Sequence, residues 1–153
     1  MLSILRDQAL VTAGIVKNSI FSVNDTIVSE GMDDRRLYLI EKGRARVTGR
    51  VALADGRYIQ PGLCDLGPGE IFGELSLFDV CSRSASVIAL DDVEALEFDV
   101  QALEGYLDAH PAQGYIVLKD VQKILTTRLR QTDRRWEQFF AWGLKEHGID
   151  RHL

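Results

Sequence analysis

The chain has 153 residues, of which 46% are hydrophobic and 27% are charged, and its formal net charge is −5. These values are those of a globular protein, and they exclude a disordered tail, a collagen-like fibre and a disulfide-dense mini-protein. No charge-free run is as long as a membrane span, and Arg6 and Asp7 interrupt the apolar stretch that a signal peptide would need. The two cysteines, Cys64 and Cys81, form neither a disulfide framework nor a metal-ligand pattern. We therefore expect a soluble, cytoplasmic protein with no membrane partner.

The N-terminal segment has the pattern of a helix. Apolar residues from Leu5 to Ala13 recur at helical spacing within residues 3–18. Gly14 stands where such a helix would stop, because glycine adopts the left-handed conformation that commonly ends helices. We therefore expect a short helix in this segment, ahead of the first strand.

Between Ile20 and Asp99 the pattern is that of a β-roll. Short runs of Val, Ile, Leu, Phe and Tyr alternate with turn residues at intervals typical of a sandwich or barrel. The clearest hairpin signal is Asp55-Gly56, since glycine adopts a positive φ at no steric cost. Further turns are expected at Asn24-Asp25, Gly43, Pro61-Gly62 and Pro68-Gly69. The expected strands include Leu37–Ile40, Ala45–Val51, Tyr58–Ile59, Ser86–Ala89 and Val93–Phe98.

After Asp99 the helical period returns. Val100–Leu107 fits one helix, and Pro111 suits the first turn of a second helix, where its missing N–H costs nothing. Gly143 is expected to end or break this second helix. Its apolar stripe comprises Leu118, Val121, Leu125, Leu129, Thr132, Trp136 and Phe140.

Residues 67–89 have the composition of an anion site. Gly73 allows close approach of the backbone, and Glu74–Leu77 is expected to form a short helical turn with free N–H groups at its start. Arg83 stands in a run of small residues, and a guanidinium binds phosphate oxygens through two parallel hydrogen bonds. The Glu74 carboxylate would repel a phosphate and therefore suits a hydroxyl donor such as a ribose 2′-OH. The alternative is a surface Glu–Arg ion pair, which would contribute little to stability.

The segment from Phe72 to Val87 resembles the phosphate-binding cassette of the cyclic nucleotide-binding domain family. It reads FGELSL from Phe72 and RSASV from Arg83. The family includes the bacterial catabolite activators, the regulatory subunits of cyclic-AMP-dependent kinase and the cyclic nucleotide-gated channels. The resemblance covers about residues 20–135 through further landmarks, namely Gly31, Leu37–Ile40, Gly43, Leu66–Gly69 and His110-Pro111.

The resemblance implies a mostly β fold with flanking helices. The core would be a double-stranded β-helix (jelly-roll) barrel with an N-terminal helix and with C-terminal hinge and lid helices. Residues 1–19 would form the N-terminal helical segment and residues 20–99 the nucleotide-binding β-roll. Residues 100–153 would form the C-terminal helices, which include the lid and a dimer or partner helix.

The same resemblance implies roles for individual residues. Arg83 would pair with the exocyclic oxygens of a cyclic phosphate, and Glu74 would accept a hydrogen bond from the ribose 2′-OH. Leu75 and Val87 would either line the sugar and base pocket or belong to the core. The anion hole would be completed by backbone N–H groups of Gly73, Leu75 or Ser76, and of Ser84 or Ala85.

Two hydroxyl residues, Ser84 and Thr132, bear on which base the site would bind. Ser84 follows the arginine, and a hydroxyl there occurs in both cyclic-AMP and cyclic-GMP binders of the family. Arg128–Asp133 resembles the segment of the catabolite activators that contacts adenine, which would place Thr132 near the base; alternatively, Thr132 is an ordinary helix-surface residue. We expect cyclic AMP rather than cyclic GMP as the ligand. The domain would be a non-enzymatic regulatory module that needs no cofactor and signals through its C-terminal helices.

The C-terminal aromatic residues indicate a further contact. Trp136, Phe139, Phe140 and Trp142 are too many aromatics for an isolated exposed helix. They would either pack back on the roll or form a dimer or partner surface, and we favour the second. Residues 1–112 hold 10 basic and 18 acidic residues, and no winged-helix pattern follows Trp136, so we expect no nucleic-acid partner.

Two other functions are alternatives, and the first of them fits the sequence poorly. A metal-dependent enzyme of the cupin type needs at least two histidines with a carboxylate inside the barrel, whereas His110, His147 and His152 all follow the strands. No Ser-His-Asp or Cys-His arrangement is evident either. The remaining alternative is a structural interaction module with the same fold and no physiological cyclic nucleotide.

Overall fold

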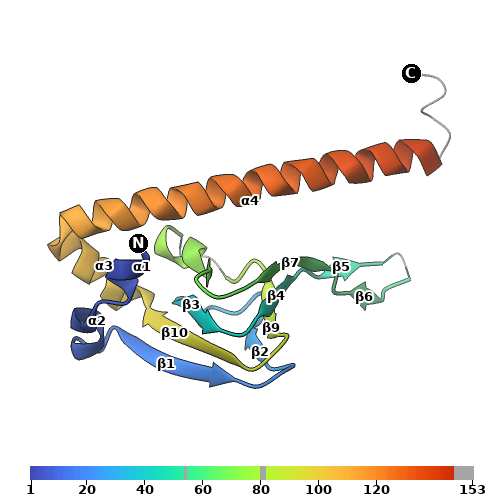
Figure 1. Ribbon diagram of the computed structural model, residues 1–153. Helices are drawn as coiled ribbons and strands as arrows, with labels where there is room; N and C mark the ends of the chain where they lie inside the picture. Colours follow the sequence, from blue (N-terminus) through green and yellow to red (C-terminus); the bar gives the residue numbers. More distant parts are fainter. Residues whose placement is uncertain (54, 80–81, 147–153) are drawn as a thin grey trace. The chain divides into compact units, whose positions relative to one another are not determined.

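The computed structural model describes the chain except residues 54, 80–81 and 147–153. The chain divides into two compact units: Leu2–Pro111 form one, and Ala112–Leu153 together with Met1 form the other. The first unit contains all the strands, and the second contains one long helix (Figure 1). Among the described residues, no helix is both long enough and apolar enough to cross a membrane.

The N-terminal segment differs from the single helix that its sequence predicts. It forms two short helices, α1 (Leu2–Leu5) and α2 (Gln8–Thr12). The break lies at Asp7, whose carboxylate accepts a hydrogen bond from Ala9 N and so begins a new helix. Gly14 ends the segment with a φ of +70°, as expected. The first strand then begins at Val16, within the range predicted to be helical.

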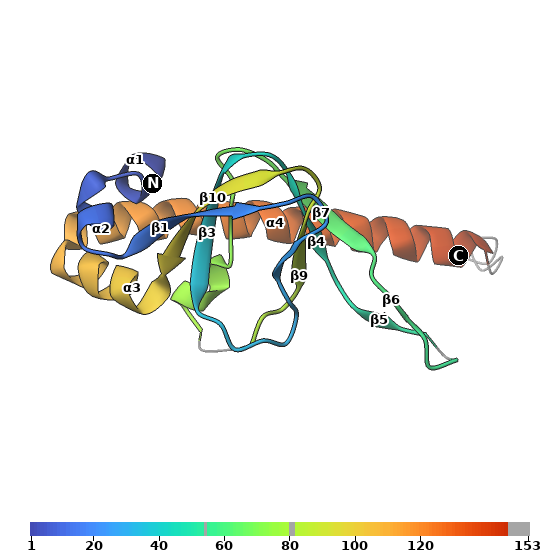
Figure 2. The same ribbon diagram turned by 90° about the horizontal axis from the view of Figure 1, so that it is seen from below.

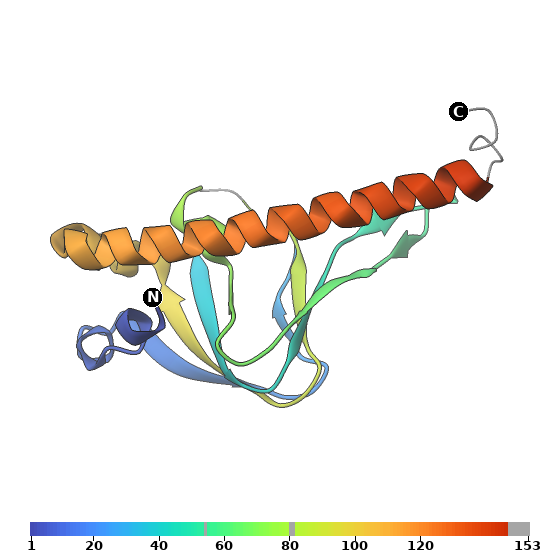
Figure 3. The same cartoon turned by 45° about the horizontal axis from the view of Figure 1, so that its top comes forward.

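Eight strands form two antiparallel four-stranded sheets that face each other across the core (Figures 1 and 3). The mostly β architecture with flanking helices, expected from the sequence, is confirmed. The first sheet has the order β1 (Val16–Phe21), β10 (Val93–Asp99), β3 (Arg36–Lys42), β8 (Ile71–Phe72). The second sheet has the order β2 (Thr26–Val28), β9 (Ser86–Ala89), β4 (Ala45–Thr48), β7 (Gly62–Leu66).

Two of the turns show why their residues suit them. Asn24 has a φ of +71°, a left-handed conformation that asparagine accepts more readily than most residues. Gly56 has a φ of +80° in the hairpin between β5 (Val51–Ala52) and β6 (Tyr58–Ile59), which extends away from the sheets in Figure 2. The strand predicted over Ala45–Val51 is wrong in its extent, because β4 ends at Thr48 and the hairpin strand begins separately at Val51.

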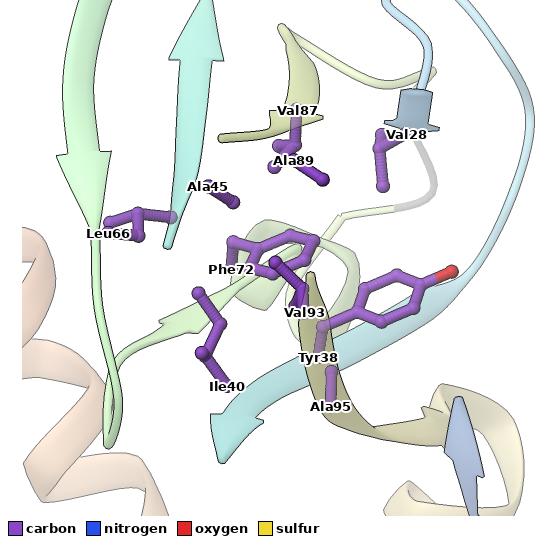
Figure 4. Packing of buried hydrophobic residues seen from close by; sticks show 10 residues of the cluster. All are labelled: Val28, Tyr38, Ile40, Ala45, Leu66, Phe72, Val87, Ala89, Val93 and Ala95. Atoms are coloured by element: carbon purple, nitrogen blue, oxygen red, sulfur yellow. The ribbon is translucent and has the colours of Figure 1, made fainter. Parts of the chain in front are cut away.

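The interior is an apolar cluster to which both sheets contribute (Figure 4). Tyr38 lies at its edge with its hydroxyl pointing away from Phe72, and the two rings stack with centroids 4.8 Å apart. Phe21 meets the Tyr38 ring edge-on at 6.3 Å. Such aromatic contacts stabilise a core beyond the area that they bury. The cluster comprises Val28, Tyr38, Ile40, Ala45, Leu66, Phe72, Val87, Ala89, Val93 and Ala95.

Two helices follow the roll, as the sequence predicts. The first, α3 (Val100–Ala109), belongs to the same unit as the strands and is capped by Asp99, whose side chain accepts from Ala102 N. The second, α4 (Pro111–Glu146), runs for 36 residues. The expected break at Gly143 is wrong, because α4 continues through it. A single glycine costs a helix only about 1 kcal/mol relative to alanine, which is too little to end so long an element.

Tyr38 gives the roll a sensitivity to alkaline pH. Burial raises the pKa of Tyr38 to about 12, and the carboxylates of Glu97 and Asp34 add to the shift. In the unfolded chain tyrosine ionises near pH ~10, so the folded state binds the phenol proton more tightly than the unfolded state does. The stability that this provides is fully present below pH ~10 and is lost as the pH rises through the folded pKa. The free energy of unfolding should therefore fall by about 2–3 kcal/mol as the pH rises from ~10 to ~12.

The measurement is urea denaturation of the wild type and of Tyr38→Phe across this pH range. The phenylalanine variant keeps the stacked ring, so it should lose less stability than the wild type above pH ~10. Parallel losses in the two proteins would contradict the assignment to Tyr38.

Candidate functional site

The predicted cassette begins where β8 ends. Gly73 has a φ of +77° and turns the chain from β8 into a short 3-10 helix, η1 (Glu74–Leu77), as the sequence predicts. A Cβ at Gly73 would clash with the carbonyl oxygen of Arg36 and would lie 2.6 Å from NH1 of Arg83. Only glycine satisfies both the backbone conformation and the close approach, so Gly73 fixes how near η1 lies to the arginine.

The guanidinium of Arg83 is almost completely buried, with 7% of the residue exposed. Its NH1 donates to Ser76 Oγ at 3.2 Å. Its NH2 donates to Asp34 Oδ2 at 3.0 Å and to the carbonyl oxygen of Arg36 at 2.8 Å. Nε is buried and has no hydrogen-bond partner among the residues that the structure describes. Because Asp34 contacts only NH2 and Nε has no partner among the described residues, part of the guanidinium's hydrogen-bonding capacity is unused.

The backbone around Arg83 is held by the connection between β2 and β3. Arg83 N donates to the carbonyl oxygen of Met32 at 2.9 Å, and Gly31 N donates to the carbonyl oxygen of Arg83 at 2.8 Å. In the same connection, Glu30 N donates to the hydroxyl Oγ of Ser86, at the start of β9, at 2.9 Å. The arginine is therefore fixed on its backbone and on its side chain by a segment some 50 positions earlier in the chain.

The other predicted cassette residues lie as follows. Glu74 and Ser76 are buried, 5% and 6% exposed, on the first turn of η1. The Ser76 hydroxyl faces Arg83, whereas its N–H, one of the groups expected in the anion hole, donates to the carbonyl oxygen of Gly73 at 3.2 Å. Leu75 is 48% exposed, so it is not a core residue, and its contact with a ligand stays a prediction.

Downstream of Arg83 the cassette passes from the surface into the core. Ser84 is exposed and Ala85 is half-buried, so the polypeptide beside the guanidinium is open to solvent on this side. Val87 is 4% exposed and belongs to the core cluster, which is the second of its two predicted roles. Thr132 lies on α4, in the other unit, and its hydroxyl donates to the carbonyl oxygen of Arg128 at 3.0 Å. A contact between Thr132 and a base stays a prediction.

Asp34 is the residue of this site that sequence reasoning missed. It lies just before β3, 49 positions from Arg83, and no local pattern marks an aspartate there as the partner of a distant arginine. The only signal available was the acidic pair Asp33-Asp34 next to two arginines. Such a run is typical of a solvated turn, so it carried no indication of a site.

The arrangement can bind a small anion. A nearly buried guanidinium stands beside a 3-10 turn, and the surrounding serines, alanine and glycine are small. Guanidinium–phosphate pairing is strong in such partly desolvated surroundings. No group of three or more His, Cys, Asp or Glu side chains among the described residues could hold a metal ion.

Comparison with known proteins assigns the family. The sequence model of the cyclic nucleotide-binding domain matches residues 20–110, a range that contains α3, the cassette and the roll except for the start of β1. This chain belongs to the cyclic nucleotide-binding domain family. The jelly-roll fold and the family resemblance expected from the cassette are both confirmed.

Two curated relatives are bacterial proteins. The chain is 32% identical over 113 residues to a CRP-like cAMP-activated global transcriptional regulator of Mycobacterium tuberculosis, covering 74% of this chain and 47% of the relative. It is 34% identical over 107 residues to the cyclic AMP receptor protein of Thermus thermophilus, covering 70% of this chain and 46% of the relative. The domain thus spans about half the length of these relatives.

Solved structures show the same fold. A cyclic nucleotide-binding domain from Methylobacillus flagellatus superposes with a TM-score of 0.71 at 26% identity, covering 80% of this chain and 66% of that one. The N-terminal domain of a transcriptional regulator from Streptomyces coelicolor gives a TM-score of 0.60 at 29% identity, covering 84% of each chain.

Replacement of Gly73 by alanine tests how closely the cassette is packed. A left-handed φ costs a non-glycine residue about 1–2 kcal/mol. Gly69→Ala is the matched control, because Gly69 has a φ of +85° and the nearest atom to its added Cβ, on Leu2, lies at an ordinary 3.9 Å. Gly69→Ala should show only this conformational cost in chemical denaturation, whereas Gly73→Ala should lose more stability because the Cβ also meets Arg36 and Arg83. Equal losses in the two variants would show that the close approach at Gly73 is unimportant.

Proposed function

We propose that this domain binds a cyclic purine nucleotide, cyclic AMP in preference to cyclic GMP, as a non-catalytic sensor. The observation that carries the proposal is the buried guanidinium of Arg83, held against η1 by Ser76 and by the β2–β3 connection. Two of the relatives are described as cAMP-activated or as a cyclic AMP receptor, which supports cyclic AMP as the first choice.

The phosphate would bind at Arg83 by partly replacing Asp34. Asp34 engages only NH2, and Nε is buried with no partner among the described residues. A cyclic phosphate offers two exocyclic oxygens, so it can accept from two guanidinium nitrogens at once. Asp34 is more exposed than Arg83, and its carboxylate can turn to water when the phosphate arrives.

The remaining cassette residues would bind the sugar and complete the anion hole. The Glu74 carboxylate would accept from the ribose 2′-OH. The N–H groups of Gly73 and Leu75 on one side, and of Ser84 and Ala85 on the other, would donate to the phosphate. Thr132 would contact the base from α4. A cytoplasmic location is part of the same proposal.

Removing Arg83 tests the site directly. Loss of one partner from a buried charge pair costs about 3–5 kcal/mol, which corresponds to roughly a 10²-fold or greater loss of affinity. Arg83→Ala should therefore abolish detectable cyclic-AMP binding in isothermal titration calorimetry, and Arg83→Lys should restore only part of it because lysine lacks the fork. Arg46→Ala is the control, since Arg46 pairs with Asp65 on the exposed surface of the roll. Unchanged affinity in Arg83→Ala would refute the assignment.

A thermal-shift screen of the wild type separates this function from the structural-module alternative. Cyclic AMP, cyclic GMP and 5′-AMP are compared at equal concentration, since a bound ligand raises stability by RT ln(1 + [L]/Kd). We expect the largest shift with cyclic AMP, a smaller one with cyclic GMP and none with AMP. If none of the nucleotides changes the melting temperature, the result would favour an interaction module whose pocket is not used.

We also propose that the aromatic end of α4 is an association surface. Trp136, Phe139, Phe140 and Trp142 are 63–72% exposed, although all four are large and apolar. Leu129, also exposed, stands one heptad before Trp136, so the stripe runs along one face of the helix. Exposed patches of this kind are typical of surfaces that another polypeptide covers. The expected partner is a second copy of this chain or another protein.

The test is the double variant Trp136→Ala/Phe140→Ala in sedimentation equilibrium. It should be monomeric at concentrations where the wild type associates, while cyclic-AMP affinity stays the same. Arg130→Ala/Arg134→Ala is the matched control, because these exposed residues have the same spacing of four on a different face of α4. A wild type that stays monomeric at all concentrations would exclude the second copy, and a partner of another kind would remain to be sought.

A further inference from the structure

A single arginine next to the site joins the anion-binding turn to the helix that follows the roll. Arg35 precedes β3 by one residue, and its NH2 donates to the carbonyl oxygen of Ser76 at 2.9 Å and to Glu104 Oε1 at 2.7 Å. Ser76 belongs to η1, and Glu104 belongs to α3. One nitrogen atom is therefore shared between the cassette and α3.

The backbone of Arg35 makes a second connection to the same helix. Its carbonyl oxygen accepts from Val100 N, the first residue of α3, at 3.2 Å. Val100 and Glu104 are four residues apart and thus lie on one face of α3. Arg35 therefore holds this helix at two points, one at its start and one a turn later.

The residues on both sides of Arg35 contact the guanidinium of Arg83. Asp34 pairs with NH2 through its carboxylate, and Arg36 accepts from the same nitrogen through its carbonyl oxygen. Three consecutive residues thus connect three elements: Asp34 and Arg36 bind the arginine of the anion site, and Arg35 binds η1 and α3. A shift of Asp34 on anion binding would act on a segment already attached to α3.

The geometry of Arg35 indicates more than a stabilising surface pair. Arg35 and Glu104 side chains are 34% and 35% exposed, and ion pairs of that exposure contribute little to stability. At the same time Nε of Arg35 is buried without a partner among the described residues, which is unfavourable. A buried group without a partner calls for an explanation, and the two contacts made by NH2 of Arg35 offer one.

We propose that Arg35 is a positioning residue that couples the anion site to α3. It fixes the carbonyl oxygen of Ser76, and hence η1 next to Arg83, and it transmits movement of η1 to α3 through Glu104. Coupling is reciprocal, so breaking the contact at Glu104 loosens η1 even without ligand. The identity of the ligand rests on the function proposed above, whereas the coupling between η1 and α3 does not.

The experiment compares Arg35→Gln, Arg35→Lys and Glu104→Gln with the wild type. Hydrogen exchange is followed at the amides of η1 and α3, with and without cyclic AMP, and affinity is measured by calorimetry. Arg44→Gln is the control, because Arg44 also pairs with a carboxylate, that of Asp91, but on the exposed surface of the roll. The free energy of unfolding of each variant is measured first, so that exchange through local opening is separated from global unfolding.

Without ligand, Glu104→Gln should accelerate exchange at Ser76 N–H in η1, although the substituted residue lies on α3. With ligand, Arg35→Gln should weaken cyclic-AMP binding by about 5–150-fold, the usual range of coupling between sites, and should abolish the ligand's effect on α3. Arg35→Lys should restore part of both effects, and Arg44→Gln should show neither.

Two results would overturn the proposal. The first is that, in the ligand-free protein, η1 of Glu104→Gln exchanges its amide hydrogens at the wild-type rate. The other is a normal response of α3 to cyclic AMP in Arg35→Gln. A wild type that binds no cyclic nucleotide would refute the proposed function instead, and the ligand-free comparison would still decide whether Arg35 couples η1 to α3.

Discussion

A buried positive charge must be paired, and in this domain that requirement organises everything around Arg83. The guanidinium lies inside the protein with one carboxylate, one hydroxyl and one carbonyl oxygen as acceptors. Gly73 is needed because any side chain there would displace the guanidinium or the backbone of Arg36. The site is therefore built around an arginine whose hydrogen bonding is incomplete, and we propose that a bound anion completes it.

The roll supplies the rigidity that such a site needs. The stacked rings of Tyr38 and Phe72 tie β3 to β8, and these are the strands that lead away from the β2–β3 connection and into η1. Val87 anchors the strand that follows Arg83 in the same core. Each end of the cassette is thus attached to a packed strand, while the proposed anion-binding groups lie between these strands in the chain.

The proposed sensor function also needs an element whose state depends on the ligand. The contacts of Arg35 supply a physical route, since the same residue holds η1 and α3. A ligand can shift an equilibrium only through contacts that differ between states. We therefore propose that the exchange of Asp34 for a phosphate at Arg83 would give rise to the signal. The family assignment makes such a route expected in general, and the contacts of Arg35 make it specific to this chain.

The sequence alone determined the local structure. The alternation of apolar runs and turns predicts the roll, Asn24 and Gly56 adopt the positive φ that their types allow, and η1 spans the four residues expected of it. The sequence predictions were wrong where two local signals oppose each other. Asp7 caps a new helix and so divides the single N-terminal helix that was expected, and α4 continues through Gly143, where an end or a break was expected. Composition alone singled out Arg83 and Glu74, and resemblance to a family motif gave these two residues and Ser76 their expected roles. Only the tertiary structure decided that Asp34 and Arg35 belong beside them, because the contacts of these two residues span 41–69 positions of the chain. Pairings of that kind depend on how strands and helices pack, and no local pattern of residues encodes them.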